Sequence, residues 1–143
     1  SEIVIGNGLT GKGGTTSFIQ GQPYNSSNTS TFFTTSDERL KKNIVDNTVG
    51  LSAINEIKVK NFEYRTEDEI TELPADQAID KQGVQLGVIA QEIQAVLPNM
   101  VIEESTGVLS VDPDNMIWHL VNAVKELSAQ VKALTTRVTE LES

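Results

Sequence analysis

The final third of the chain carries the most regular pattern of apolar and polar positions. Two apolar series repeat every seven residues over nearly four heptads, with mostly polar residues between them. We call these positions the seam: Ile117, Val124, Val131 and Val138 form one series, and Leu120, Leu127, Leu134 and Leu141 the other. The repeat predicts a coiled-coil helix over residues 113–143, with Asp112 as N-cap and Pro113 as its first residue.

The pattern leaves the number of helices in this coil open. β-Branched residues in one series and leucine in the other favour two helices. Val121 and Ala123 flank the seam and widen its apolar face near the start, which suits a third helix. Arg137 and Glu142 occupy positions that pair between neighbours in a parallel, in-register coil, so we expect the chains to run in the same direction.

Shorter elements are expected between residues 45 and 112. Apolar spacing predicts a helix of one or two turns at 51–57, strands within 58–65 and 84–88, a helix at 90–97, and an antiparallel strand pair at 101–102 and 108–111. Phe62 and Tyr64 would share one face of the first strand. The acidic stretch 66–82 contains Pro74 and predicts a solvated loop. The fold class expected from these elements is α+β.

Residues 1–35 differ in composition from the rest of the chain. They are rich in Gly, Ser, Thr and Asn, and their only charges are Glu2 and Lys12. Short apolar runs between turn residues predict strands at 3–5, 15–19 and 31–34. Each run is too short and polar to form a core alone, so we expect residues 1–35 to be the end of a longer, trimeric β-rich fibre.

One motif in this segment resembles a phosphate-binding loop. Gly6, Gly11 and Lys12 have the required spacing after an apolar strand, but Gly13 stands where Ser or Thr should hold magnesium. Nothing in the following residues predicts the helix whose N-terminus would face a phosphate. We interpret the motif as a glycine-rich turn.

Charge and composition exclude several function classes. The net charge of −9 lies entirely after residue 35 and argues against nucleic acid or anionic membranes as partners. The absence of cysteine excludes disulfides and thiolate metal sites, and the acidic stretch lacks the pattern of a calcium loop, so we expect no metal and no cofactor. With 38% hydrophobic and 5% aromatic residues, burial is expected to be shared between subunits. We expect His119 to be exposed and Trp118 to pack on the body.

The boundary at residue 36 offers a candidate serine–lysine pair. A serine hydroxyl is a weak nucleophile until a base removes its proton, and lysine can be that base only while its amine is neutral. Lys41 is the nearest candidate for Ser36, and its positive neighbours Arg39 and Lys42 favour the neutral amine. Side chains five residues apart face each other in neither helix nor strand, so the pair requires a bend in the chain or two different subunits.

The alternative is a purely structural role for Ser36. A serine followed by Asp37 and Glu38 is a good helix N-terminus, in which the hydroxyl caps the helix and the acids face the positive end of its dipole. Gln91 and Glu92 are similarly interpreted as solvent-facing helix residues.

Several motifs, in order, resemble one protein family. They are Ser-Asp-x-Arg-Leu-Lys-x-Asn-Ile at 36–44, Gly-Val-Ile-Ala-Gln-Glu-Ile at 87–93 and Leu-Pro at 97–98. Together they resemble the intramolecular chaperone, or peptidase S74, domain of phage tailspikes, tail fibres and neck appendages, which has a relative in the myelin regulatory factors. The resemblance covers residues 36–143. It implies a homotrimeric folding clamp that is released by self-cleavage at Ser36 with Lys41 as base, and it favours three helices in the coil.

Two bonds beside Ser36 are candidates for cleavage. Attack by its hydroxyl oxygen on the Thr35 carbonyl passes through a five-membered ring, whereas attack on its own carbonyl needs a strained four-membered one. We therefore favour the bond between Thr35 and Ser36, through an ester that water hydrolyses. The bond between Ser36 and Asp37 remains possible if another group or another chain attacks.

With this resemblance, we expect an intramolecular chaperone that trimerises and folds the upstream part of the same chain. It would belong to a virion tail fibre, spike or appendage that assembles in the host cytoplasm. A structural trimeric tip without peptidase activity is the alternative. An attachment module for a sugar or receptor is less favoured because the aromatic residues are few and scattered.

Overall fold

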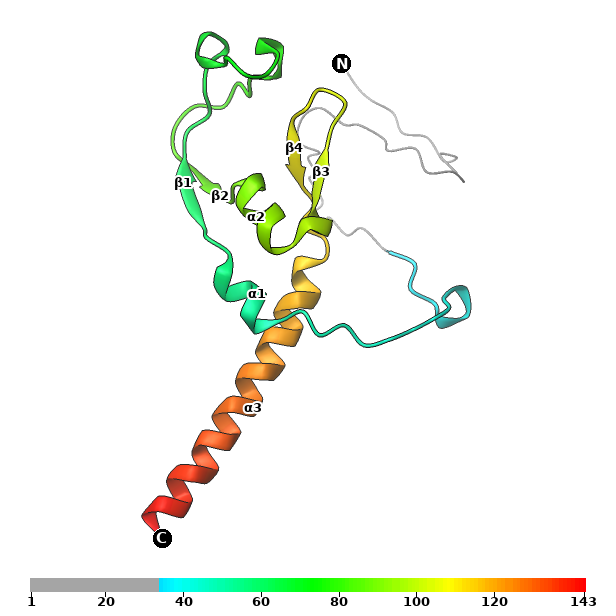
Figure 1. Cartoon of the computed structure of the whole chain (residues 1–143), viewed down its shortest axis with the longest axis vertical. Coiled ribbons are helices and arrows are strands. Elements are labelled where there is room, and N and C mark those ends of the chain that lie inside the picture. The colour runs from blue at the N-terminus through cyan, green and yellow to red at the C-terminus, as the bar shows by residue number, and fades with distance from the viewer. Residues whose placement is uncertain (1–33) are drawn as a thin grey trace, which may run out of the picture. The chain divides into compact units, whose positions relative to one another are not determined.

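The computed structural model describes residues 34–143 (Figure 1). The chain divides into two compact units, Ser1–Ile44 and Val45–Ser143. The predicted strands and the glycine-rich turn within residues 1–33 lie outside the described residues. In the first unit, the described part contains a single turn of 3-10 helix, Glu38–Leu40.

The second unit mixes short strands and helices, as expected for an α+β fold. Its main elements are α1 (Leu51–Glu56), β1 (Lys60–Phe62), β2 (Gln85–Gly87), α2 (Ala90–Val96), β3 (Val101–Glu103), β4 (Leu109–Val111) and α3 (Met116–Glu142). β1 pairs with β2 and β3 with β4, giving two separate antiparallel two-stranded sheets. The predicted elements at 51–57, 84–88, 90–97 and 101–111 are confirmed. The stretch 66–82 is a loop interrupted by two 3-10 turns, Glu67–Glu69 and Ala75–Gln77.

The core of this unit is centred on α2 and the turn that follows it. Ile93 and Leu97 are one helical turn apart and bury the same face, and Met100 joins them from the 3-10 turn Pro98–Met100. Ile93 is only 2% exposed. Partly buried side chains from the other elements surround this cluster: Val49, Ala53, Ile57, Val88, Val96, Val101, Val111 and Met116. Few residues are fully buried, so the second unit alone has a small core.

The sheet of β1 and β2 turns an apolar face outward. Leu86 lies opposite Asn61 in the register and is 74% exposed, and Val59 and Val84 are 66% and 69% exposed. The other face is turned toward α2, because Lys60 Nζ lies 3.3 Å from Glu92 Oε1. Phe62 is half-buried on the same face as Lys60, so both faces of this sheet carry apolar side chains, and the outer one leaves an apolar surface available for contact.

The long helix α3 begins later than the sequence predicts. The expected N-cap Asp112 and first residue Pro113 lie before it, and the helix starts at Met116 with Asn115 as N-cap. The Asp112 N–H donates to the Met100 carbonyl at 2.7 Å, which keeps this residue tied to the end of the β3–β4 sheet. Asp112 instead caps a separate turn, since its Oδ1 accepts the Asp114 N–H at 3.0 Å.

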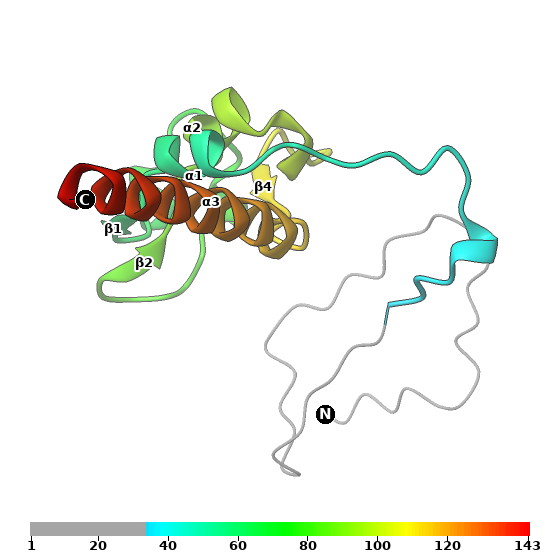
Figure 2. The same cartoon turned by 90° about the horizontal axis from the view of Figure 1, so that it is seen from below.

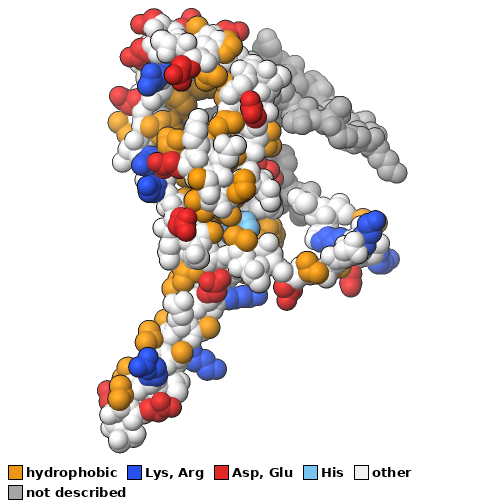
Figure 3. Space-filling model, in the orientation of Figure 1, with side chains coloured by type: hydrophobic (Ala, Val, Ile, Leu, Met, Phe, Trp, Pro, Cys, Tyr) orange, Lys and Arg blue, Asp and Glu red, His pale blue; other side chains and the backbone are white. Residues whose placement is uncertain are grey.

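α3 extends from the body with its seam exposed. Every seam residue is exposed, from 44% at Leu120 to 83% at Leu141, and hydrophobic side chains line the projecting helix (Figure 3). Near its start, α3 packs against α1, and the two lie side by side in both views (Figures 1 and 2). Ala123 is buried to 3% exposure in this region. Within residues 34–143, no helix combines the length and apolar character needed to span a membrane.

Candidate functional site

The structure brings Ser36 and Lys41 together within one chain. The Lys41 Nζ atom donates a hydrogen bond to the Ser36 Oγ atom at 2.6 Å. The 3-10 turn between them makes this possible, because the Lys41 N–H donates to the Glu38 carbonyl at 2.9 Å and reverses the chain. The bend, one of the two arrangements that the spacing allows, is present in the single chain. A nucleophile within hydrogen-bond reach of its base is the geometry that serine catalysis requires.

Asp37, not Ser36, caps this turn. Its Oδ1 accepts the Arg39 N–H at 2.9 Å, and its carboxylate also pairs with the Arg39 guanidinium, with 2.6 Å between Oδ2 and Nη2. The structural role predicted for Ser36 therefore falls to the next residue, because the Asp37 carboxylate can bind both the backbone and the side chain of Arg39. The Ser36 hydroxyl is bound by Lys41 and does not cap the turn.

The ion pair also shifts the pKa values of Asp37 and Arg39. The side-chain hydrogen bond from Arg39, assisted by its backbone N–H, holds the pKa of Asp37 below the ordinary value. The same bond raises the pKa of Arg39. Both groups therefore stay charged at neutral pH, and the ion pair between them persists.

The surroundings of the Ser36–Lys41 pair are open. Both side chains are exposed. In the observed bond the lysine donates, whereas a base must accept the hydroxyl proton, so the bond has to reverse before Lys41 can activate Ser36. Burial favours the neutral amine, and the described part of the first unit does not provide it. The chain then continues through Asn43, whose positive φ of 55° is a conformation that asparagine tolerates well.

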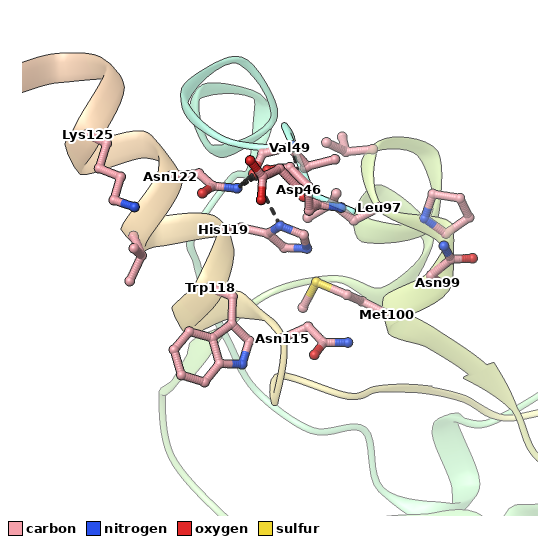
Figure 4. Close-up of a pocket in the computed structure, with 14 residues that line it drawn as sticks. Asp46, Val49, Leu97, Asn99, Met100, Asn115, Trp118, His119, Asn122 and Lys125 are labelled. Carbon is pink, nitrogen blue, oxygen red and sulfur yellow. Dashed lines mark hydrogen bonds between the residues drawn. The ribbon is translucent and has the colours of Figure 1, made fainter. Parts of the chain in front are cut away.

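A second cluster of polar contacts lies in the other unit and was not predicted. His119, expected to be exposed, is half-buried, and its Nδ1 lies 3.3 Å from the Val49 carbonyl (Figure 4). Asn122 Nδ2 donates to the carbonyls of Asn47 and Val49, both at 3.0 Å. Glu126 Oε2 accepts the Leu51 N–H at 3.2 Å. We call His119, Asn122 and Glu126 the clasp.

Two clasp residues, His119 and Asn122, line a groove of about 770 Å³ between α3 and the end of α2. Figure 4 shows Trp118, His119 and Asn122 of α3 on one side and Leu97 and Met100 on the other. Trp118 was expected to pack on the body but is 63% exposed at the rim. The signal for the clasp was present in the sequence as polar residues at i, i+3 and i+7 beside the seam, but their partners lie about 70 residues away in the chain.

Of the two helix residues predicted to face solvent, only Gln91 does so. Glu92 is half-buried, and its Oε1 pairs with Lys60 at 3.3 Å. Its other carboxylate oxygen is buried without a hydrogen-bond partner in the described chain. The reason is tertiary, because Lys60 of β1 pairs with this residue although it lies about 30 residues earlier in the chain. Residues 34–143 bring together no group of three or more Asp, Glu or His side chains suited to a metal ion.

Comparison with known proteins extends the picture. Residues 36–102 match the family model described as the chaperone of endosialidase, peptidase S74. The match begins at Ser36 and includes Lys41 and the motif at 87–93. The chain is also 29% identical over 105 residues to Myelin regulatory factor homolog 1 of Caenorhabditis elegans. That alignment covers 73% of this chain but only 11% of the relative's length.

Proposed function

We propose that this chain is an intramolecular chaperone released by self-cleavage at Ser36, which the match of residues 36–102 to the chaperone of endosialidase family supports. Three copies associate through α3, guide the upstream segment of the same polypeptide into its trimeric form, and are then cut away. The proposed setting is a phage tail fibre or spike that assembles in the host cytoplasm. The observation that carries the cleavage is the 2.6 Å hydrogen bond between Lys41 and Ser36.

Association is supported by the apolar surface of the described chain. The seam is exposed along the whole of α3, and the outer face of β1 and β2 adds Val59, Val84 and Leu86. Burying one leucine side chain stabilises an assembly by roughly 1.5–3 kcal/mol, so repeated seam positions can hold several helices together. We favour three parallel helices, with Arg137 of one helix near Glu142 of the next.

The proposed reaction starts with an acyl shift at the Thr35–Ser36 bond. Neutral Lys41 removes the Ser36 hydroxyl proton while Oγ attacks the Thr35 carbonyl carbon. The amide C–N bond breaks, the Ser36 nitrogen receives the proton, and an ester joins Thr35 to Oγ. Water then hydrolyses this ester, which leaves a Thr35 carboxylate and restores the Ser36 hydroxyl on a new N-terminus.

Assembly supplies what the single chain lacks at this site. Ser36 and Lys41 are both exposed, so the amine stays solvated in a lone chain. Contact with neighbouring subunits would remove water and favour the neutral amine. Cleavage would then follow correct assembly and would not precede it.

The proposed chaperone role lowers the entropic cost of bringing three upstream segments together. The polar segment 1–35 offers few apolar residues for nucleation, and pairing strands from separate chains is slow. A trimer held together downstream raises the effective concentration of the three upstream segments and holds their ends together. After cleavage, the folded fibre would be trapped kinetically.

Mass spectrometry and sedimentation of freshly expressed full chain test the proposal. Wild type should sediment at three times 15.6 kDa before processing and yield a fragment beginning at Ser36 or Asp37. Ser36→Ala should stay whole and trimeric, whereas Ser128→Ala on α3 should be processed like wild type. A monomeric wild type, or processed Ser36→Ala, would overturn the assignment.

A structural trimeric tip without peptidase activity is the second candidate. It is favoured by the direction of the Lys41–Ser36 bond, in which the lysine is the donor. In that case wild type would form the same trimer and remain whole through prolonged incubation.

A further inference from the structure

The clasp occupies a side of α3 that a coil leaves free. Counting heptads from Ile117, His119 and Glu126 fall at the third position and Asn122 at the sixth, whereas the seam uses the first and fourth. Third and sixth positions face away from partner helices in a parallel coil. One helix can therefore bind its partner helices and hold residues 47–51 of its own chain at the same time.

The clasp binds main-chain atoms. Its hydrogen bonds go to the carbonyls of Asn47 and Val49 and to the N–H of Leu51. α1 has no side-chain cap of its own, because Gly50 stands at its N-cap and its first turn contains no acidic residue. Glu126 supplies the missing acceptor from α3, and its negative charge is favourable at this helix end.

Gly50 is the residue that lets Glu126 approach. A β-carbon added at this position would clash with the Glu126 carboxylate and sit 3.1 Å from the Asn122 Cβ. Any larger residue would therefore push the carboxylate away from the Leu51 N–H. The contact depends on the sequence at both ends, in α3 and at the start of α1.

The segment held by the clasp is the continuation of the candidate cleavage loop. Only five residues lie between Lys41 and Asn47, so the Cα atoms of the two can be no more than about 22 Å apart. Fixing Asn47 on α3 limits the volume that Ser36 and Lys41 can sample.

We infer that the clasp residues His119, Asn122 and Glu126 are positioning residues for self-cleavage. Through them, the rate of self-cleavage depends on the assembly of α3. This inference rests on the proposed function. It adds that part of the control over cleavage lies about 80 residues downstream of the Ser36–Lys41 pair, on the helix that forms the coil.

Matched variants on α3 test the inference in the full chain. Glu126→Ala removes a clasp carboxylate, and Glu140→Ala removes a carboxylate at the same heptad position outside it. At the sixth heptad position, Asn122→Ala changes a clasp residue, and Thr136→Ala is its control outside the clasp. Cleavage rates are measured on material shown by sedimentation to be trimeric, together with hydrogen exchange of the Leu51 amide.

The clasp variants should slow cleavage roughly ten- to hundredfold in intact trimers, because a small misplacement of reacting groups has effects of that size. Their Leu51 amide should exchange faster, while Glu140→Ala and Thr136→Ala behave like wild type. Glu126→Gln should recover most of the rate, because its amide oxygen can still accept the Leu51 N–H. If the clasp only stabilised the fold, the cleavage rate would fall only as far as the fraction of trimer fell.

Gly50→Ala is an independent variant that leaves the sequence of α3 unchanged. It tests the role of the clasp if an α3 variant fails to form trimers. It should slow cleavage to a similar extent. Trimers of the clasp variants that exchange Leu51 faster but cleave at the wild-type rate would overturn the inference alone. A wild-type trimer that never cleaves would overturn the proposed function and this inference together.

Discussion

The Lys41 Nζ atom lies 2.6 Å from the Ser36 Oγ atom across a single turn of 3-10 helix. Asp37, which caps that turn, binds Arg39 within it, with 2.6 Å between Oδ2 and Nη2. The carboxylate therefore does not compete for the Lys41 ammonium, although it is close in sequence. This division of contacts explains how a short, exposed segment can bring a serine and a lysine together without a buried core.

Replacement of Lys41 separates a catalytic role from a structural one. Arginine keeps a donor near Ser36 but stays protonated, so it cannot act as a base. We expect Lys41→Arg and Lys41→Met to lose self-cleavage equally, by about a thousandfold or more, with trimers unchanged. The measurement is the fraction of whole chain over time by mass spectrometry.

Lys132→Gln on α3 is the control for these two variants, because it removes a positive charge from the chain and leaves the Lys41–Ser36 bond and the neighbours of Lys41 unchanged. It should cleave within a few-fold of wild type. Retained cleavage in Lys41→Arg would show that the lysine only holds the loop.

A charge in the seam should separate the subunits. Leu127 is 46% exposed in the single chain, and in a coil its side chain would be surrounded by partner helices. Leu127→Asp places carboxylates against each other in an apolar seam, so we expect monomers at micromolar concentration. Sedimentation velocity measures the change. Ala129→Asp, which places the same charge on the outer side of α3, should remain trimeric, and dissociation of both variants alike would contradict the predicted seam.

The outward apolar face of β1 and β2 should stabilise only the assembled protein. Leu86 is 74% exposed, so Leu86→Gln should change the stability of a monomer by no more than about 0.5 kcal/mol. If a neighbouring subunit covers this face, the same change should destabilise the trimer by roughly 1–3 kcal/mol per chain.

Denaturant unfolding of Leu86→Gln, with and without Leu127→Asp, measures both values. Asn61→Gln serves as control because Asn61 is the polar residue opposite Leu86. Equal effects of Leu86→Gln in monomer and trimer would show that this face stays open to solvent.

The Asp37–Arg39 ion pair makes the stability of the turn Glu38–Leu40 depend on pH. Arg39 holds the pKa of Asp37 below the ordinary value of about 3.9. The depressed pKa means that the pair stabilises the turn fully above that ordinary value and that this contribution is lost as pH falls through the lower, folded value. The turn should therefore persist at pH 5 and open only under stronger acid.

Carbon-13 NMR titration of the Asp37 carboxyl follows this transition directly. Arg39→Gln should raise the pKa of Asp37 toward the ordinary value, whereas Lys42→Gln should leave it lowered. A wild-type Asp37 that already titrates at the ordinary value would contradict the observed hydrogen bonds.

Local pattern was enough to predict much of the fold. The helical spacing of Leu51, Ile54 and Ile57 predicted α1, and Ile93 with Leu97 before Pro98 predicted α2 and its buried face. The heptads predicted a long terminal helix, and the motifs at 36–44, 87–93 and 97–98 predicted the match to the chaperone of endosialidase family. These features depend on residues within a few positions of one another, so periodicity and turn chemistry are sufficient to find them.

Tertiary structure decided the features that join distant parts of the chain. The start of α3 at Met116 depends on the Asp112–Met100 bond, and the half-burial of His119 and Glu92 depends on Val49 and Lys60. Glu126 caps a helix that begins 75 residues before it. A sequence read by itself shows which residues can donate or accept a hydrogen bond and which faces are apolar. It does not show which partner reaches each group, because that depends on the packing of elements whose contacts are long-range in the chain.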